Sequence, residues 1–229
     1  MNRVSQLLAN KKDKLLVPYI CAGDPSLDIT KQIILSINGV VDMIHLGIPF
    51  SDPIAQSPTT QKSSLRALDN GVKLINIFDM IEDIRNTIET PICLVLYANT
   101  IYKYGLESFL KKCNTCGIDA ILVLDLPIEE GANLRKYAKE CNIRIINIVC
   151  SNSNERNNLV LNHSDNYVVS MMNKKIDSSI IVLDDYSEGV SKCINNGVIV
   201  AKELIDIIDT NDNIVDNIKT MLVSVKNNL

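Results

Sequence analysis

The sequence contains no tryptophan and only three phenylalanines among its 229 residues, and it lacks the marks of several protein classes. No apolar run approaches the roughly 20 residues that a membrane-spanning helix needs, so no membrane span is expected. The 23 basic and 27 acidic residues are interspersed and give a net charge of −4. That balance offers neither a basic face for nucleic acid nor a polybasic patch for a membrane surface, so neither partner is expected.

The seven cysteines are odd in number and irregularly spaced, which does not indicate a framework of disulfides. The first residues carry charges but no apolar stretch before a cleavage site, so they do not predict a signal peptide. They indicate a short amphipathic helix with Val4, Leu7 and Leu8 on one side. A reducing cytoplasm is therefore the expected location.

What the sequence does contain is a regular alternation of short apolar runs and longer amphipathic segments. The apolar runs are continuous, as in parallel strands that are covered on both faces. The segments between them have the apolar spacing of helices, for example Ile75–Ile88 and Glu130–Cys141. Eight strands are predicted: Leu15–Cys21, Val41–Gly47, Ile92–Tyr97, Ala120–Leu126, Arg144–Cys150, Tyr167–Met172, Ser179–Leu183 and Val198–Ala201.

This order of elements predicts an α/β fold, a single (β/α)8 TIM-barrel domain over residues 1–229. No G-x-G-x-x-G loop follows the first strand, which favours a barrel over a doubly wound sheet. Only about six residues, 173–178, separate the sixth and seventh predicted strands. Because a parallel crossover usually needs a dozen or more residues, we predict that the helix after strand six is missing. The chain then either connects strands six and seven by an extended segment without a helix, or leaves the barrel locally open.

Four strand ends carry distinctive motifs, at the place where a TIM barrel holds its chemistry. The first reads PYICAGDP at 18–25 and the second HLGIPFSDPIAQSP at 45–58. The third reads YAN at 97–99, and the fourth reads DLPIEE at 125–130. In order and spacing this series resembles the tryptophan synthase alpha subunit family. The resemblance covers about residues 1–172, and beyond them only the general alternation of strands and helices of a barrel continues.

The resemblance implies a retro-aldol cleavage of indole-3-glycerol phosphate to indole and glyceraldehyde 3-phosphate, with no cofactor in this chain. It also implies a partner, the β subunit of tryptophan synthase, which uses pyridoxal phosphate to join the indole to serine. In the family one glutamate moves protons and one aspartate supports positive charge on the indole. His45 and Gln56 stand at these two positions here. Because each acid–base role is worth roughly 10²–10⁴-fold in rate, the substitutions predict that the family reaction is lost.

Four residues at the barrel mouth are predicted to bind substrate: Tyr19, Tyr97, Asp125 and Lys202. The family holds its phosphate on glycine-rich turns after strands six, seven and eight, and these turns are replaced. At the seventh strand Asp184 and Asp185 stand instead, and their charges would repel a phosphate. A family tyrosine on strand six is also absent, with Val169 near its place. The phosphate site is therefore predicted to be lost independently of the reaction centre.

The partner-facing motifs are kept. In the family the loop after strand two, the YAN turn and the loop with the PxEE motif contact the β subunit. Six residues at those positions are predicted to bind the partner: Pro49, Asp52, Asn99, Pro127, Glu129 and Glu130. Kept docking motifs beside replaced catalytic ones predict an alpha-like subunit that docks on the β subunit and activates it.

Other interpretations stay open. His45 could serve a weakly active lyase, or one changed to a non-phosphorylated substrate, and the chain could be a remnant without a selected role. A thiol–imidazole pair of Cys21 and His45 is geometrically possible at the ends of adjacent strands. Cys113 and Cys116 have redox or metal spacing, although packing explains them better. No metal is expected, because the family pattern explains three mouth carboxylates as loop organisers: Asp24, Asp52 and Asp125.

Overall fold

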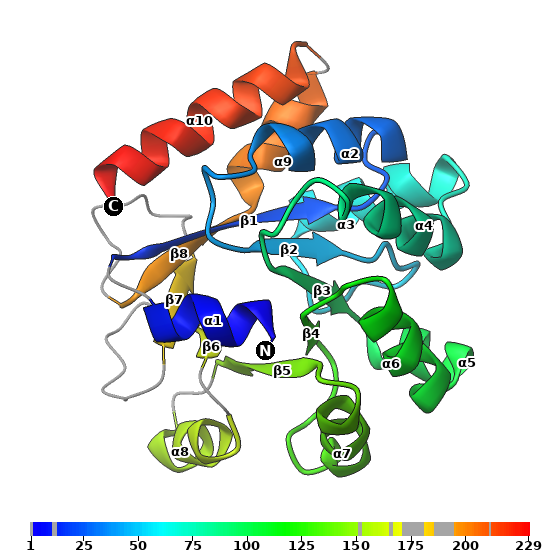
Figure 1. The fold of residues 1–229 in the computed structure, drawn as a ribbon, viewed down its shortest axis with the longest axis vertical. Coiled ribbons are helices and arrows are strands. Elements are labelled where there is room, and N and C mark those ends of the chain that lie inside the picture. The colour runs from blue at the N-terminus through cyan, green and yellow to red at the C-terminus, as the bar shows by residue number, and fades with distance from the viewer. Residues whose placement is uncertain are drawn as a thin grey trace.

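Eight parallel strands close into a barrel, each paired with its neighbours in chain order and the last paired with the first (Figure 1). The computed structural model describes residues 2–10, 13–150, 153–164, 167–170, 181–185, 195–210 and 212–229, and for 181–185 only the backbone. The strands are β1 Leu15–Cys21, β2 Ile44–Gly47, β3 Ile92–Leu96, β4 Ala120–Val123, β5 Arg144–Val149, β6 Tyr167–Ser170, β7 Ile181–Asp185 and β8 Gly197–Val200.

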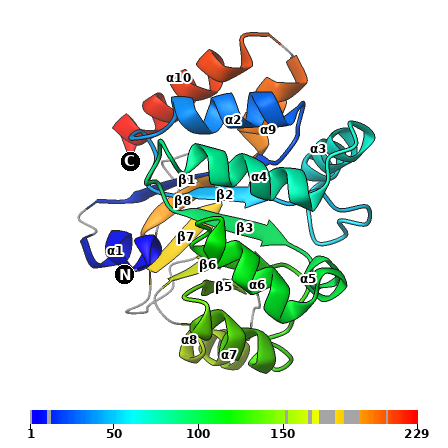
Figure 2. The same ribbon diagram turned by 45° about the vertical axis from the view of Figure 1, so that its right-hand side comes forward.

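Helices surround this barrel on its outer side (Figure 2). The described helices are α1 Arg3–Asn10, α2 Leu27–Ser36, α3 Pro58–Asp69, α4 Leu74–Ile84, α5 Ala98–Tyr104, α6 Leu106–Thr115, α7 Ala132–Glu140, α8 Asn154–Asn162, α9 Lys202–Thr210 and α10 Ile214–Asn228. None of them is long and apolar enough to cross a membrane.

The predicted α/β barrel is confirmed, and each of its strands overlaps a predicted segment. Helices α5 and α10 were not predicted, although α10 buries Ile218 and Leu222 at helical spacing and packs against α2 and α9. The predicted absence of a helix after strand six falls on residues 171–180, which lie outside the described residues. The barrel is closed at this point, because β6 and β7 pair in parallel with Tyr167 opposite Ile181.

Alternate side chains of each strand enter two separate cores. On β1, Leu16 and Ile20 pack with the apolar faces of the surrounding helices, whereas Leu15, Val17 and Tyr19 belong to the cluster inside the barrel. The same alternation continues along β2, β3 and β4. Because both faces of these strands are buried, their sequences read as continuous apolar runs.

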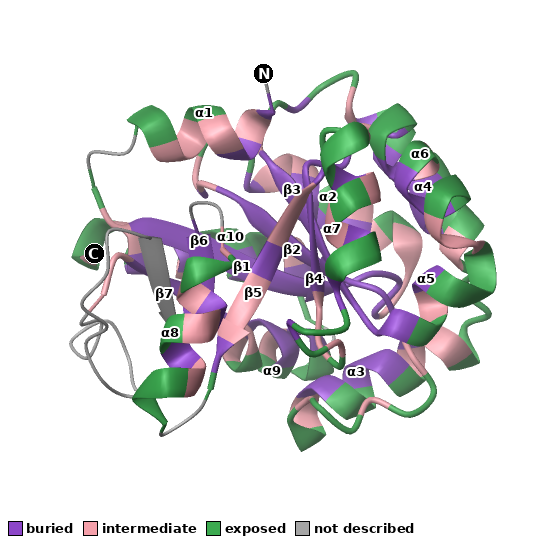
Figure 3. Ribbon diagram, turned by 90° about the horizontal axis from the view of Figure 1, so that it is seen from below, coloured by how far each residue is buried: buried purple, intermediate pink, exposed green. Residues whose placement is uncertain are grey.

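The wall at β5 is less well covered than the walls at β1, β2 and β3 (Figure 3). Four of the six residues of β5 are only partly buried, whereas β1, β2 and β3 are buried throughout. The neighbouring helix α8 contributes one small cluster, in which Val160 packs with Val149 and Val168. The side of the barrel formed by β5 and β6 therefore has the thinner outer core among the described parts.

Helix α1 covers the end of the barrel where the strands begin (Figure 2). Val4 packs into the interior cluster, with Leu7 and Leu8 partly buried beside it, so the predicted amphipathic helix is confirmed. The Asn2 side-chain amide donates hydrogen bonds of 2.8 Å to the backbone carbonyl of Asp119 and of 2.8 Å to that of Asn142. These bonds anchor the start of α1 to the loops that precede β4 and β5.

A buried ion pair lies under this helix. Asp119 is 3% exposed, and its Oδ2 accepts hydrogen bonds from Arg85 Nη2 at 2.8 Å and from the Ile92 backbone N–H at 2.9 Å. Arg85 also donates to the carbonyls of Gly117 and Thr90, at 2.8 and 2.7 Å. Burial raises the pKa of Asp119 and lowers that of Arg85 to about 10, so each charge depends on its partner and not on water.

Replacing Asp119 with asparagine is expected to lower the free energy of unfolding by roughly 3–5 kcal/mol, because it leaves the buried Arg85 guanidinium without its carboxylate. Urea denaturation at neutral pH measures this loss. Asp83→Asn is the matched control, since Asp83 pairs with Lys31 on the surface and its loss should change little. Equal losses for the two variants would show that the Asp119 pair contributes no more than a surface pair.

Candidate functional site

A cavity of about 590 Å³ opens at the end of the barrel where the strands finish. Strands β1 to β6 and β8 line it, together with the loops after β2 and β4 and residues of α8. Most of its lining side chains are apolar, among them Val95, Leu122, Ile148, Val169 and Ile199. Its volume falls within the range of roughly 300–1,000 Å³ that is typical of small-molecule sites.

His45 lines the deep part of this cavity from the second position of β2, and it is only 2% exposed. Its Nε2 shares a hydrogen bond of 2.9 Å with Tyr167 Oη, at the start of β6. Burial lowers the pKa of His45 to about 3, because desolvation disfavours the charged imidazolium. The imidazole is therefore neutral at physiological pH.

Gln56 reaches the cavity from the loop after β2 and is tied to the first strand. Its Nε2 donates a hydrogen bond of 3.0 Å to Tyr19 Oη. Tyr19 is 6% exposed, and its phenol lies directly over Gly47. A Cβ on residue 47 would come within 2.2 Å of Tyr19 Oη, so only glycine leaves room for the ring. The glycine of the HLG motif thus determines where Tyr19, and through it Gln56, is held.

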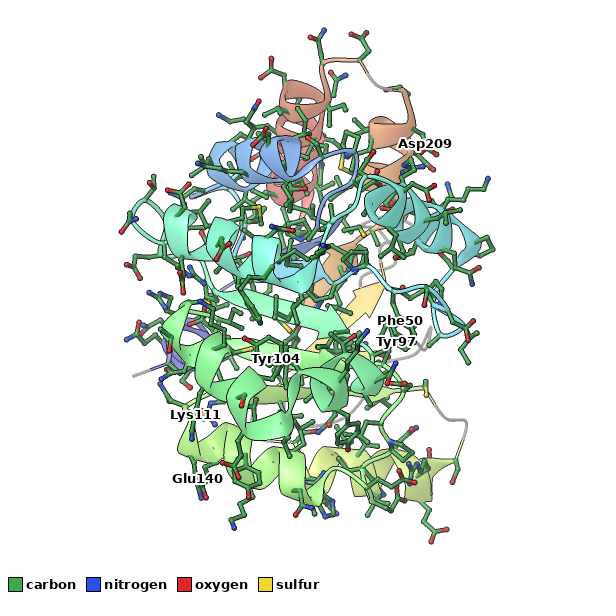
Figure 4. All side chains as sticks on the ribbon, turned by 90° about the vertical axis from the view of Figure 1, so that its right-hand side faces the viewer. Phe50, Tyr97, Tyr104, Lys111, Glu140 and Asp209 are labelled. Carbon is green, nitrogen blue, oxygen red and sulfur yellow. The ribbon has the colours of Figure 1, made fainter. Side chains whose placement is uncertain are left out.

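A second tyrosine, Tyr97, also contacts the loop after β2. Tyr97 Oη accepts a hydrogen bond of 3.1 Å from the Ala55 backbone N–H. The Tyr97 ring stacks on Phe50, with centroids 4.6 Å apart and planes at 17° (Figure 4). Asp125 lines the cavity, and its Oδ1 accepts a hydrogen bond of 2.7 Å from the Ala98 backbone N–H. Tyr97 is absent from the cavity wall and organises the loop above it.

The loop after β1 is organised by a buried carboxylate. Asp24 is fully buried and accepts hydrogen bonds of 2.7 Å from both Arg66 Nε and Arg66 Nη2 on α3, and a further one from Ser63 Oγ. Arg66 also pairs with Asp209 on α9, which Figure 4 labels near the edge of the molecule. These contacts link the first mouth loop to two helices, in agreement with the predicted role of Asp24 as a loop organiser.

The structure describes only part of the mouth after β6, β7 and β8, where the family resemblance puts the phosphate. Lys202 begins α9 directly after β8, but its Nζ donates to Asp206 Oδ2 at 2.7 Å, and it does not line the cavity. Asp184 and Asp185 end β7, and only their backbone is described. Residues 171–180 after β6 and 186–194 after β7 lie outside the described residues, and with them most of the helix predicted over Ser187–Asn195. Val169 lines the cavity at the place predicted to have lost a tyrosine.

Five of the six predicted partner-binding residues are exposed: Asp52, Asn99, Pro127, Glu129 and Glu130. The sixth, Pro49, is buried. Ile54, beside Asp52 in the loop after β2, is 78% exposed and was not predicted to be a partner contact. Glu129 forms an ion pair with Arg156 on α8, with Arg156 Nη2 to Glu129 Oε2 at 3.1 Å.

The alternative chemistries find little support in the described residues. Cys21 Sγ lies 3.9 Å from Ser64 Oγ, and burial raises the pKa of its thiol to about 11, while His45 bonds to Tyr167 instead. Cys113 and Cys116 are buried and free, and burial raises the pKa of both thiols, so packing explains them. No cluster of three or more potential metal ligands occurs within the part of the chain that the structure describes.

Three contributors to the site were not predicted from the sequence. They are Tyr167, which bonds to His45, and the two arginines Arg66 and Arg156. Tyr167 is 122 residues from His45 in the chain. The sequence showed only that a tyrosine stands at the start of a predicted strand, which does not predict a contact with His45. No periodicity links the arginines to their carboxylates, because those pairs depend on which loops the closed barrel brings together.

Comparison with known proteins places this architecture among alpha chains of tryptophan synthase. A sequence model of the family described as "Tryptophan synthase alpha chain" matches residues 5–175, ending close to where the motif resemblance was predicted to fade. A tryptophan synthase alpha chain from Petrotoga mobilis is 35% identical, with 92% of each chain covered. One from Thermoanaerobacter pseudethanolicus is 40% identical over 172 residues, which cover 73% of this chain and 66% of that protein.

Solved structures agree with the sequence relatives. Tryptophan synthase subunit alpha from Legionella pneumophila str. Paris superposes with a TM-score of 0.88 at 27% identity, covering 100% of this chain and 98% of that one. A structure described as the basis of mutual activation of the tryptophan synthase a2b2 complex from Pyrococcus furiosus gives a TM-score of 0.85 at 31% identity. That match covers 95% of this chain and 99% of the other.

The buried His45 predicts a pH-dependent stability. Its pKa of about 3 in the folded state lies below the value of 6.5 for a free histidine, so the unfolded chain binds the extra proton between these pH values. This contribution to stability is complete above pH 6.5 and is lost as the pH falls toward 3. Relative to His45→Gln, the wild-type protein should lose about 2–3 kcal/mol of unfolding free energy between pH 7 and pH 4.5. Urea denaturation of both proteins at pH 7 and pH 4.5 measures this loss. If the two proteins differ in unfolding free energy by the same amount at both pH values, His45 is not a buried, neutral group.

Proposed function

Because this chain belongs to the tryptophan synthase alpha chain family, we propose that it is an alpha-type subunit that has lost the family reaction and acts on its partner. The reaction lost is the retro-aldol cleavage of indole-3-glycerol phosphate to indole and glyceraldehyde 3-phosphate. The role kept is docking on the β subunit of tryptophan synthase and activating it. The observation that carries the proposal is the absence of a carboxylate at both reaction positions, His45 and Gln56.

The neutral state of both groups explains why the reaction would fail. The family chemistry needs one group that moves protons and another that supports a cation. His45 has a pKa of about 3 and Gln56 is an amide, so neither group carries a charge near pH 7, and neither readily gains or loses a proton there. Losing a positioned acid–base group removes roughly 10²–10⁴ in rate, which is roughly 3–5 kcal/mol of barrier for each group.

The surface at the mouth supports the docking half of the proposal. Asp52, Asn99 and the loop of Pro127, Glu129 and Glu130 are exposed around the cavity, where the family resemblance puts partner contacts. The loop after β2 is fixed from below by Tyr19 and Tyr97, so it does not need to be ordered when a partner binds. One solved relative was described in an a2b2 complex with mutual activation. We also propose a cytoplasmic location, with which the six free cysteines among the described residues agree.

The deciding measurement is the rate of tryptophan formation from indole and serine by a β subunit, with and without this protein. Faster formation is expected on addition of the protein, while indole-3-glycerol phosphate in a parallel mixture stays uncleaved. The variant Asp52→Arg should weaken the activation, because it reverses a charge at a predicted contact, and Asp79→Arg on the exposed side of α4 is its control. An unchanged rate with wild-type protein would remove the proposed activating role.

The competing hypothesis is a lyase that uses His45 as its acid–base group. The pKa of His45, about 3, argues against this hypothesis, because an acid–base group works best when its pKa lies near the ambient pH. We expect the double variant His45→Glu, Gln56→Asp to remain without measurable cleavage of indole-3-glycerol phosphate. Tyr167 still lies against position 45 in this variant, and the family's phosphate-binding turns are still replaced. Indole release measures the activity. Cleavage by the wild-type protein that His45→Gln abolishes would instead support the competing lyase.

A further inference from the structure

The sequence asparagine–glycine–valine occurs three times in the chain, at residues 38–40, 70–72 and 196–198. In an asparagine–glycine pair, the backbone nitrogen of the glycine can attack the side-chain carbonyl carbon of the asparagine, because glycine has no Cβ to hinder the approach. A cyclic succinimide forms and ammonia leaves. The three copies have the same reacting groups, so differences between their rates in the folded protein come mainly from the structure around them.

The first two copies are equally open to water. Asn38 lies at the C-terminal end of α2 and Asn70 at that of α3, and both are exposed. The following residues, Gly39 and Gly71, have φ of +79° and +73°. A Cβ built on either glycine would meet no atom within 4 Å. Exposure and crowding therefore do not distinguish these two copies.

Hydrogen bonds engage both reacting groups of the copy at Asn70. The Gly71 N–H donates to the Leu68 carbonyl at 2.8 Å. The Asn70 Nδ2 donates to the backbone carbonyl of Pro25 at 2.6 Å. Both bonds must break before the Gly71 nitrogen can attack and ammonia can leave. The folded structure therefore slows the reaction at this copy.

The copy at Asn38 has the opposite arrangement. Among the contacts of the described residues, the Gly39 N–H forms no hydrogen bond, so the attacking nitrogen is free. Asn38 Oδ1 accepts a hydrogen bond of 2.9 Å from the Thr90 hydroxyl. Negative charge develops on this oxygen as the nitrogen attacks, and a donor held at the oxygen stabilises that charge. Thr90 is itself held, because its backbone carbonyl accepts a hydrogen bond of 2.7 Å from Arg85.

The third copy lies in the barrel wall. Gly197 is buried and is the first residue of β8, where it lies opposite Leu15 of β1. The backbone carbonyl of Asn196 accepts a hydrogen bond of 2.9 Å from the Leu15 N–H. A succinimide at this copy would require the pairing between the first and last strands to open. Asn196 is therefore also expected to react slowly.

We propose that Asn38 is a site of spontaneous deamidation, and that the fold promotes the reaction there while it protects Asn70 and Asn196. The Gly39 nitrogen forms a bond to the side-chain carbonyl carbon of Asn38, and its proton leaves with the amide nitrogen as ammonia. Water then opens the succinimide to give aspartate or isoaspartate, so water is the only co-reactant. The inference does not depend on the proposed function, because this turn precedes β2, at the end of the barrel opposite the mouth.

Both products are expected to destabilise the turn between α2 and β2. The new carboxylate lies at the C-terminal end of α2, where the helix dipole disfavours negative charge. Isoaspartate also adds a carbon atom to the main chain between Ile37 and Val41, whose side chains are both buried. The protein is therefore expected to lose stability as it ages.

Timed incubation of the full-length protein near neutral pH, followed by peptide mapping, tests the inference. Trypsin separates the three copies into peptides 32–62, 67–73 and 193–202, and mass spectrometry measures the deamidated fraction of each. Asn38 should deamidate about tenfold faster than Asn70 or more, because two hydrogen bonds must break at Asn70. In concentrated urea, where the chain is unfolded, the three copies should react at similar rates.

Variants of Thr90 test the role of its hydroxyl. Thr90→Val removes the hydroxyl at nearly constant size and should slow the deamidation of Asn38 by about fivefold. Thr90→Ser is the matched control, since it keeps the hydroxyl and should keep the wild-type rate. The rate at Asn70 in the same molecules is an internal standard and should not change. Thermal unfolding establishes that each variant is folded.

Equal rates at Asn38 and Asn70 in the folded wild-type protein overturn the inference, as does an unchanged rate at Asn38 in folded Thr90→Val. A faster reaction at Asn38 that Thr90→Val slows and Thr90→Ser keeps supports it. The comparison within the wild-type protein needs no variant, so it decides the matter even where a variant fails to fold. Aged protein should unfold at a lower temperature than fresh protein, and an unchanged temperature would overturn the proposed loss of stability.

Discussion

The two-residue period of eight paired strands decides which side chains meet at the mouth. In the observed register Tyr19 lies opposite His45, and His45 lies opposite Cys93, so these three side chains face the same closed interior. A residue at such a position cannot turn toward water without moving its strand. His45 is therefore almost fully buried, and desolvation is the main influence on its pKa. On an exposed loop the same histidine would be an ordinary titrating group.

Much of the site follows from this constraint together with local motifs. The motifs at 18–25 and 45–58 contain the elements that fix the mouth: a buried aspartate, a glycine beneath a tyrosine, and a loop held at two points. The loss of charge that we propose at His45 and Gln56 is accordingly not accompanied by loss of the surrounding contacts. These kept contacts around an uncharged pair of residues agree with the proposed docking role.

The sequence predicted the strands and the mouth loops well because each depends on neighbouring residues: apolar runs, glycine and proline at turns, and short motifs. It did not predict the Tyr167–His45 bond or the ion pairs of Arg66 and Arg156, since these contacts join segments far apart in the chain. Pro49 shows the same limit, because its motif suggested a surface contact and only the folded loop shows that it is buried. Helix α10 could have been predicted from the sequence, since its buried residues recur at helical spacing.

The seam of the barrel has a consequence for how the protein is made. Strand β1 pairs with β8 over Leu15–Pro18 and Gly197–Val200, so this edge of the first strand has no partner until β8 has been synthesised. Until then the nascent protein presents an open curved sheet with an unpaired edge, a surface prone to wrong pairing. The ring is completed only after residue 200 has left the ribosome, so closure of the barrel follows the synthesis of all eight strands.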